Sequence, residues 1–437
     1  MIASHGFDGM SLLRGLLGMI AVLGIAWLFS TDRKRIDWRL VASGLFLQII
    51  MALAILYVPF IGVFFEYAGK LFIRLIGFTQ EGVAFLIGPY ASREHGVVFL
   101  IHSLTSLIFF SALVSLFYYW GIIQRIVSAF SWLLRRLLRG ISGAEGLVVA
   151  GNVFLGMTES PLMIKNYIPK MNRPELFLVM VSGMGTIAGT VMGAYIGMLG
   201  GSDPVAQVFF AKHLLSASVM AAPAAIVLAR MIYPQTGRVD SHAATTMKSE
   251  HKNAIEALAS GTSMGIKLMV NVAAMLLVFI ALVALVNYVF EGLVGRYTGL
   301  NGWVANVTGG KSEGFTVQFI LGVLLAPLMW VAGVPTDDMV TVGSLLGQKT
   351  VLNEFVAYFQ MQEWKNAGIF IYEKSVVMST YLLCGFANVA SIGMLVGGLS
   401  IMAPEKRSMI AGLGFKSMIA GALVSILSAV VIGMIAG

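Results

Sequence analysis

Two glutamates are the residues best suited to chemistry in this sequence, because each interrupts a long apolar stretch. Glu159 lies in "GNVFLGMTESPLMIK" and Glu354 lies in "GSLLGQKTVLNEFVAY". A carboxylate inserted into a membrane costs about 3 kcal/mol, so it normally faces an aqueous cavity or a partner. A glutamate that only caps its own hairpin turn is the alternative interpretation. Their paired arrangement favours a polar binding site within the membrane.

Neutral oxygens beside the first glutamate predict a cation site. The helix before it ends with free carbonyls near Leu155, while Asn152 and Thr186 add an amide and a hydroxyl. Such ligands suit a small monovalent cation better than a divalent one. The six histidines are scattered, and we find neither a nucleophile–base pair nor a dinucleotide-binding glycine loop. We therefore expect a protein that is not an enzyme.

The elements that position these residues belong to a membrane protein. Of the 437 residues, 58% are hydrophobic and only 11% are charged, which is typical of membrane proteins. A spanning helix needs about 20 apolar residues. Eight segments meet that need: 11–30, 41–59, 97–120, 174–200, 205–233, 264–290, 366–400 and 408–436. The sequence thus predicts an all-α polytopic membrane protein with eight transmembrane helices.

The net charge of +8 reflects membrane topology and not nucleic-acid binding. Basic residues follow every odd-numbered span, as at 33–39 after the first and 135–139 after the third. The positive-inside rule places these loops in the cytoplasm. With eight crossings, both termini are then expected on the opposite side.

The chain divides at one hydrophilic stretch into two similar halves. Residues 234–262 form this linker, predicted to be cytoplasmic, and residues 1–96 hold two transmembrane helices plus an interfacial amphipathic helix. Residues 97–233 and 263–437 each hold a transmembrane helix, an amphipathic helix, a re-entrant hairpin and two further transmembrane helices. The interfacial helix is predicted within 61–90 because three charged residues recur every four positions: Glu66, Lys70 and Arg74.

The two predicted hairpins, at about 141–169 and 335–362, carry the two glutamates. After each glutamate the chain is expected to continue as a helix. Each first arm runs roughly 22 Å before its glutamate, too short to cross a bilayer. Capping residues are expected at the start of each: Ser142 with Glu145, and Thr336 with two aspartates at 337 and 338. One hairpin enters from each side of the membrane, so the repeats are inverted. Inverted repeats with interrupted helices are typical of secondary transporters.

Four stretches of the sequence carry a family resemblance. "GMTESPLMIKNYI", "MGTIAGTVMGAY", "GSLLGQKTVLNEFVAY" and "LCGFANVASIG" together resemble the concentrative nucleoside transporter family, and the match runs from the first span to the end of the chain. The resemblance implies a homotrimer in a bacterial inner membrane. It implies uptake of uridine or a similar nucleoside with sodium, or in some branches protons, by an elevator mechanism. Lipid is then a partner and nucleic acid is not.

The resemblance also implies roles for individual residues. Glu354 would hold the ribose with Asn388 and Ser391, and the first hairpin tip would meet the nucleobase. The full substrate set carried over is Met157, Thr158, Glu159, Val191, Glu354, Phe386, Asn388 and Ser391. Sodium would be held by Asn152, the Leu155 carbonyl, Thr186 and the Ile187 carbonyl.

One position departs from the family, and two alternatives remain open. Met157 stands where the family usually has glutamine. A thioether is at best a weak acceptor, so the preferred nucleobase is left open. Proton coupling through Glu159 or Glu354 is the nearest alternative to sodium coupling. A membrane-embedded enzyme acting on a nucleoside or lipid-linked substrate is the more distant one.

Overall fold

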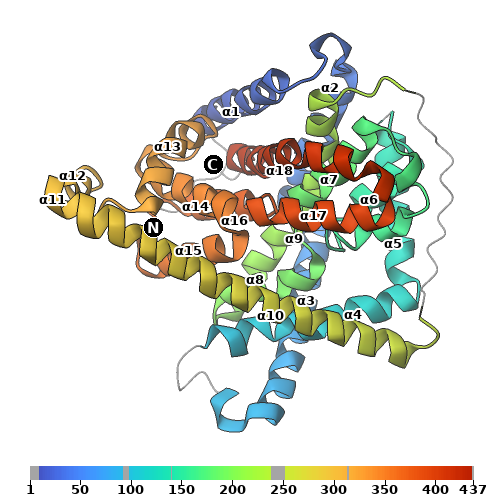
Figure 1. The fold of residues 1–437 in the computed structure, drawn as a ribbon, viewed down its shortest axis with the longest axis horizontal. Helices are drawn as coiled ribbons and strands as arrows, with labels where there is room; N and C mark the ends of the chain where they lie inside the picture. Colours follow the sequence, from blue (N-terminus) through green and yellow to red (C-terminus); the bar gives the residue numbers. More distant parts are fainter. Residues whose placement is uncertain (1–8, 92–97, 139, 238–250, 313, 436–437) are drawn as a thin grey trace.

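The chain folds into helices throughout the part that the structure describes. This computed structural model describes residues 9–91, 98–138, 140–237, 251–312 and 314–435, and within these ranges every regular element is helical (Figure 1). The predicted all-α class is therefore confirmed. Residues 238–250 of the predicted linker lie outside the described residues, as do the ends of the predicted spans 97–120 and 408–436.

Seven helical stretches in the described residues are long and apolar enough to cross a membrane. They are α1 (Gly9–Leu28), α2 (Trp38–Tyr57), Leu100–Tyr119 with α4 (Ser106–Tyr119), Arg173–Gly200 with α7 (Arg173–Gly185) and α8 (Gly189–Gly200), α9 (Pro204–Ile232), Ala254–Thr298 with α10 (Ala254–Asn287) and α11 (Arg296–Thr298), and Pro404–Ile435 with α18 (Arg407–Ile435). The seventh predicted span, 366–400, is instead two shorter helices, α16 (Glu373–Leu383) and α17 (Val389–Met402). The count of eight crossings stays a prediction.

Shorter or more polar helices connect these spans. They are α3 (Pro59–Ile87), α5 (Ile122–Leu137), α6 (Gly143–Gly151), α12 (Leu300–Val307), α13 (Val317–Val331), α14 (Met339–Val351) and α15 (Glu354–Asn366). Helix α3 contains the predicted amphipathic stretch, where Lys70 Nζ lies 2.6 Å from Glu66 Oε1 one turn away. It packs against α2 and α9, and its place at the membrane interface stays a prediction.

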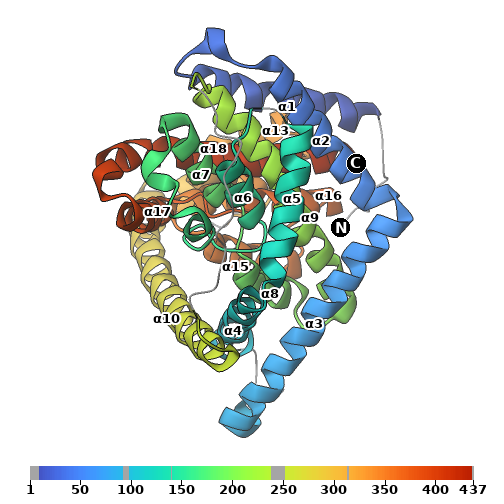
Figure 2. The same ribbon diagram turned by 90° about the vertical axis from the view of Figure 1, so that its right-hand side faces the viewer.

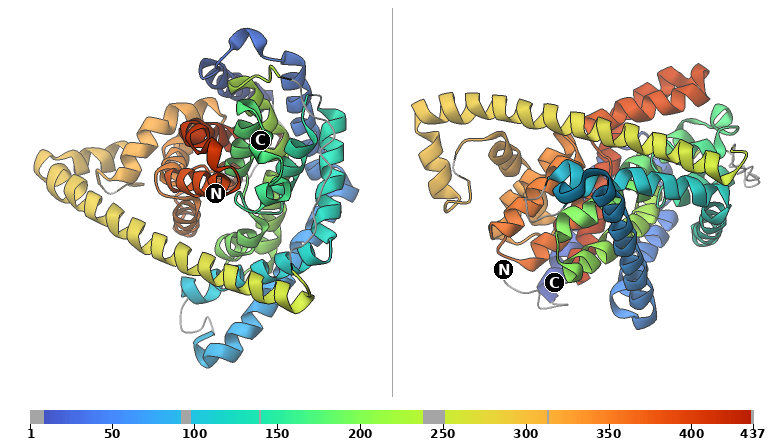
Figure 3. Two further views of the ribbon diagram at one scale, coloured as in Figure 1. Left: turned by 45° about the vertical axis from the view of Figure 1, so that its right-hand side comes forward. Right: turned by 90° about the horizontal axis from the view of Figure 1, so that it is seen from below.

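The broken helices lie at the centre and α10 lies outside them. Helix α18 packs against α7, α9, α16 and α17, while α10 packs mainly on α4 along one side of the molecule (Figures 1 and 2). In the most apolar 18 residues of Arg173–Gly200, 94% of the residues are buried. In the most apolar 18 residues of Ala254–Thr298, only 6% are buried. Figure 3 shows α10 as a long rod along the edge. The groups available for binding are therefore held by the inner helices.

The two hairpins differ in their second arms. In the second hairpin α14 is followed by a regular helix, α15. In the first, α6 is followed only by short 3-10 turns at Ser160–Ile164 and Ile168–Lys170. The prediction that both hairpins continue helical after the glutamate is wrong for the first one. Pro169 removes a backbone donor that an α-helix continuing from Ser160 would need. Pro161 lies in the first turn, where a missing donor costs little.

The predicted caps are correct for the first hairpin and wrong for the second. Ser142 and Glu145 form a reciprocal capping box at the start of α6. Asp338 does not cap α14. Its carboxylate accepts from the backbone N–H groups of Ile371 and Tyr372 at 3.0–3.1 Å and from Lys311 Nζ at 3.2 Å. These donors, one of them charged, hold the carboxylate away from the helix end.

Candidate functional site

Two broken helices meet at the centre of the site. Helix α7 stops at Gly185 before α8 begins at Gly189, and α16 stops at Leu383 before α17 begins at Val389. The Phe386 N–H of one break donates to the Thr186 carbonyl of the other at 3.3 Å. This backbone bond joins the two halves of the chain where both leave unpaired backbone groups.

A glycine allows the second break to approach the first so closely. Gly385 has a φ of +153°, and a Cβ atom there would lie 2.9 Å from the Met184 carbonyl oxygen and 2.9 Å from Ser425 Oγ. Any side chain at this position would be both strained and crowded. The glycine-rich composition of these segments thus serves backbone contact between the breaks.

Glu354 lies buried at this crossing with two donors directed at its carboxylate. Asn353 caps α15, so Glu354 becomes the first residue of that helix. The Tyr195 hydroxyl of α8 lies 3.1 Å from Glu354 Oε1, and Asn388 Nδ2 donates to Oε2 at 3.0 Å. A carboxylate can accept about four hydrogen bonds. It therefore has acceptor capacity left for hydroxyl groups of a ligand.

Asn388 and Ser391 hold the next polar positions along α17. Asn388 Oδ1 accepts from the Ser391 N–H at 2.9 Å, which caps α17 and fixes the side chain that binds Glu354. The Ser391 Oγ is buried and makes no hydrogen bond to any described residue. Buried hydroxyls are normally paired, so this group is available to a ligand. Phe386, half-buried, comes from the break just before Asn388.

Glu159 partly follows the alternative interpretation, because its carboxylate closes its own turn. Oε2 accepts from the Gly156 N–H at 2.9 Å. The residue is nevertheless half-exposed, and it lines a cavity of about 420 Å³. Thr158 beside it is exposed, and a Cβ built at Gly398 of α17 would lie 3.4 Å from Thr158 Cγ2. The first tip thus caps itself and also faces both a cavity and α17.

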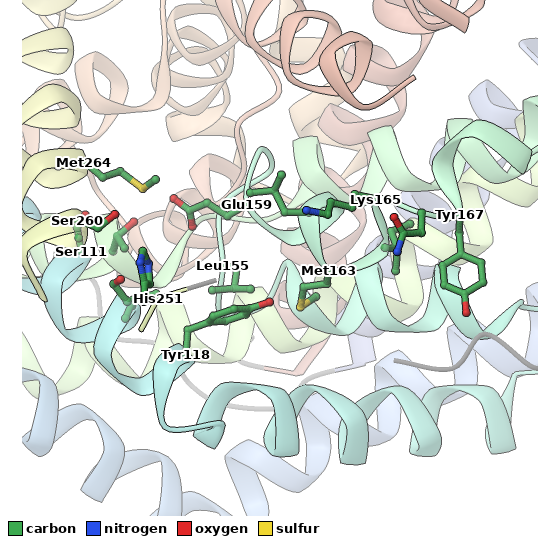
Figure 4. Close-up of a pocket in the computed structure, with 17 residues that line it drawn as sticks. Ser111, Tyr118, Leu155, Glu159, Met163, Lys165, Tyr167, His251, Ser260 and Met264 are labelled. Carbon is green, nitrogen blue, oxygen red and sulfur yellow. The ribbon is translucent and has the colours of Figure 1, made fainter. Parts of the chain in front are cut away.

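The cavity lies between the first hairpin and the helices α4, α8 and α10. Figure 4 shows Glu159 among side chains from α4, such as Ser111 and Tyr118, and from α10, such as Met264. The only predicted site residues that line it are Leu155 and Glu159. Met157, two residues before Glu159, and Val191, next to the lining residue Thr190, are both buried. A Cβ at Gly183 would lie 2.8 Å from Met157 Cβ. Glu354 and Asn388 therefore form a separate cluster beyond this cavity.

Asn152 and Thr186 converge on one serine. Asn152, at the end of α6, donates through Nδ2 to Ser182 Oγ at 2.8 Å and accepts from Ser160 Oγ at 2.6 Å. Thr186 Oγ1 donates to the Ser182 carbonyl at 2.9 Å. The described hydrogen bonds of this cluster join neutral groups only. Neutral hard oxygens fit a sodium ion. Leu155 and Ile187, both buried, follow Asn152 by three residues and Thr186 by one.

Charged contacts fix both ends of the first hairpin. Arg230 of α9 donates to Glu145 Oε1 at 2.5 Å, and both side chains are at most 5% exposed. At the other end, Lys406 Nζ donates to the Met171 carbonyl. A buried pair is costly to break because either charge would be left unpaired. The base of the hairpin is therefore anchored to α9 and to the loop before α18.

Three residues of the site escaped the sequence analysis. Ser182 precedes Thr186 by one helical turn, a spacing that places both on one face. Tyr195 and Thr190 carry the two hydroxyl groups of α8, a glycine-rich apolar helix. Lys349 is a buried cation in the second hairpin, and the cost that drew attention to the glutamates applies equally to it.

Interrupted membrane helices that meet around buried polar groups define a membrane transporter of a polar solute. Family models agree and cover most of the chain: Na+ dependent nucleoside transporter N-terminus at residues 17–90, Nucleoside recognition at 100–202, and Na+ dependent nucleoside transporter C-terminus at 213–433. The chain belongs to the Na+-dependent, concentrative nucleoside transporter family, and its relatives include bacterial members. Sodium is the coupling ion that this membership implies.

Several bacterial relatives and solved structures match this chain over nearly their whole length. An uncharacterized transporter of Haemophilus influenzae is 37% identical, covering 98% of this chain and 99% of its own. The nucleoside permease NupC of Helicobacter pylori is 35% identical, covering 98% of both. CNTnw in an inward-facing substrate-bound state superposes with a TM-score of 0.85 at 37% identity, covering 97% of both chains. A CNTnw variant in an outward-facing state gives 0.87.

Proposed function

We propose that the protein takes up nucleosides into the cell together with sodium ions that move down their inward gradient. The observation that carries this proposal is the cluster of Glu354, Tyr195, Asn388 and the unpaired Ser391 Oγ at the crossing of two broken helices. A carboxylate that retains free lone pairs, next to an unpaired hydroxyl, suits a vicinal diol such as that of ribose. The chemistry performed is binding and translocation, and no bond of the nucleoside changes.

The nucleoside would lie between the two hairpin tips. Glu354, Asn388 and Ser391 bind the ribose, and Phe386 lies against the base. Thr158 and Glu159 of the first tip meet the base edge, and buried Met157 and Val191 bound its apolar side. Glu159 keeps one carboxylate oxygen beyond the one bonded to Gly156 for this contact. An analogue that lacks a hydroxyl would leave buried groups unpaired and bind weakly.

Sodium would lie beside the first tip, held by Asn152, Thr186 and the carbonyls of Leu155 and Ile187. The Thr186 carbonyl already accepts from Phe386 N–H, so the ion site and the base site share one stretch of backbone. A bound ion would order the break between α7 and α8. Through the Thr186 carbonyl, this would favour the position in which Phe386 binds the substrate. Such an effect is reciprocal, so nucleoside must tighten sodium binding by the same factor.

The assembly would be a homotrimer in the bacterial inner membrane, with both termini periplasmic and the hairpins moving as an elevator against a scaffold. The anchoring of both ends of the first hairpin, by Arg230 and Lys406, favours its movement as one body with α9. The exposed apolar length of α10 is available to lipid or to neighbouring protomers.

The test is labelled uridine uptake into proteoliposomes under a sodium gradient, a proton gradient or no gradient. We expect concentrative uptake with sodium alone and recovery of unchanged uridine. Uptake driven only by a proton gradient would indicate that protons, and not sodium ions, are the coupling ions. Equilibration without accumulation would indicate a passive channel, and chemically altered uridine would indicate an enzyme.

A further inference from the structure

Lys349 is a fully buried lysine that the proposed transport chemistry does not use. It lies in the last turn of α14, and its side chain is 0% exposed. Its Nζ donates to the Leu382 carbonyl at 2.8 Å and to Ser425 Oγ at 2.9 Å. Ser425 Oγ donates in turn to the Cys384 carbonyl at 3.1 Å. The ammonium thus binds, directly or through one serine, two carbonyls at the end of α16.

These ligands are of the kind expected for a metal cation. Carbonyl and hydroxyl oxygens at the carboxyl end of a half-helix attract positive charge, because the helix dipole leaves about half a negative charge there. An ammonium buried without such compensation would be very costly. The end of α16 therefore stabilises a positive charge, and Lys349 supplies it from within the chain.

The position of Lys349 in the second repeat matches that of Asn152 in the first. Each lies at the end of its hairpin's first helix, Asn152 seven residues before Glu159 and Lys349 five residues before Glu354. Each also contacts the half-helix that ends at the following break. Asn152 binds Ser182 of α7, and Lys349 binds Leu382 of α16. The first repeat offers neutral groups at this place, whereas the second repeat holds a charge.

We propose that the Lys349 ammonium is a built-in cation at the second-repeat counterpart of the sodium site, so that one sodium ion accompanies each nucleoside. The inference rests on the proposed sodium-coupled function. A tethered cation stabilises the break before Phe386 and Asn388 without dissociating. Sodium is then needed only at the first break. The two inverted repeats therefore bind one sodium ion and not two.

The first test measures the stoichiometry of the unaltered protein. In proteoliposomes with a tenfold sodium gradient and no membrane potential, one ion per nucleoside limits uridine accumulation to about tenfold and two ions to about a hundredfold. We expect the lower limit and a sodium Hill coefficient near one. Accumulation toward the higher limit would overturn this inference alone. Absence of any sodium-driven uptake would instead refute the proposed function.

The second test removes the charge and then restores it. Lys349→Met fills the space without charge, and we expect uridine uptake to fall about tenfold or more, because a hydrogen-bonded charge is lost. Lys349→Arg should keep one-sodium coupling. Lys349→Ser vacates the oxygens, so uptake should recover at high sodium with a Hill coefficient above one. The matched control is Lys365→Met, since Lys365 Nζ also donates to a helix-end carbonyl, that of Leu199, away from the breaks.

The variants are compared only as folded protein with an unchanged elution profile. Native uptake and coupling in Lys349→Met would show that the charge is dispensable and would overturn the proposal. A folded Lys349→Ser variant that sodium fails to restore would overturn the assignment as a counterpart cation site. If no variant at 349 folds, the stoichiometry of the unaltered protein still decides.

Discussion

Replacing Glu354 by glutamine tests the ribose site with almost no change of volume. The carboxylate accepts from Tyr195 at 3.1 Å and from Asn388 at 3.0 Å, on separate oxygens. Glutamine offers only one acceptor oxygen, and its amide N–H groups would face one of these two donors. The substitution therefore weakens the existing network and removes the charge that a ribose hydroxyl would bind.

The expected loss follows from hydrogen bonds to charged groups. Such a bond contributes about 1.5–3 kcal/mol, so losing one should weaken uridine binding about 10- to 150-fold. We expect Glu354→Gln to insert into the membrane normally and to lose nearly all uptake. The control is Glu363→Gln, the same change at an exposed position of α15, which should bind uridine as the unaltered protein does.

The assay is calorimetric binding of uridine and of its 2′- and 3′-deoxy analogues to purified protein. The unaltered protein should discriminate strongly against at least one deoxy analogue, and Glu354→Gln should lose most of that discrimination. A variant that binds uridine at close to native affinity would refute the ribose assignment. So would a variant that binds weakly but keeps the full preference for both hydroxyls.

Three further substitutions probe the ion site, the base and the break. Asn152→Leu should remove sodium dependence before nucleoside binding is lost, and sodium that still tightens uridine binding several-fold would place the ion elsewhere. Met157→Gln should shift the competition ratios of uridine, cytidine and adenosine by a few-fold to about tenfold, as one hydrogen bond allows; unchanged ratios would mean that position 157 does not face the base. Gly385→Ala should lower thermal stability by about 1–3 kcal/mol through strain and contact with the Met184 carbonyl. An equal effect in Gly397→Ala, where a Cβ meets open space, would contradict that explanation.

The helical class was predictable from composition, but the exact form of the broken helices was not. Seven described stretches meet the criteria for spans, and the predicted span 366–400 separates into α16 and α17. Hydropathy averages over about 20 residues, so it did not resolve a five-residue break within 366–400. The glycine at 385 and the capping asparagine at 388 were visible in the sequence, but only the spatial contact with Met184 explains why α16 stops there.

The carboxylates were predictable, whereas their partners were not. Glu354 was conspicuous because charge is rare in such a segment. Its donor Tyr195 lies 159 residues away in the chain, and no periodicity links the two. For Asp338 the sequence did predict a partner for the carboxylate, and that partner was wrong. Its position at a helix start predicted a cap, yet tertiary donors from Lys311 and from the residues before α16 bind its carboxylate instead.

The buried pair of Glu145 and Arg230 also has a consequence for the order of assembly during synthesis. Arg230 follows Glu145 by 85 residues and lies in the last turn of α9. Until the ribosome has made that helix, the hairpin's carboxylate lacks its buried ion-pair partner Arg230, and a charge buried without its partner costs several kcal/mol. The first hairpin should therefore wait at the membrane surface while α7, α8 and α9 insert. It would enter the membrane only afterwards, so the order of insertion differs from the order of the sequence.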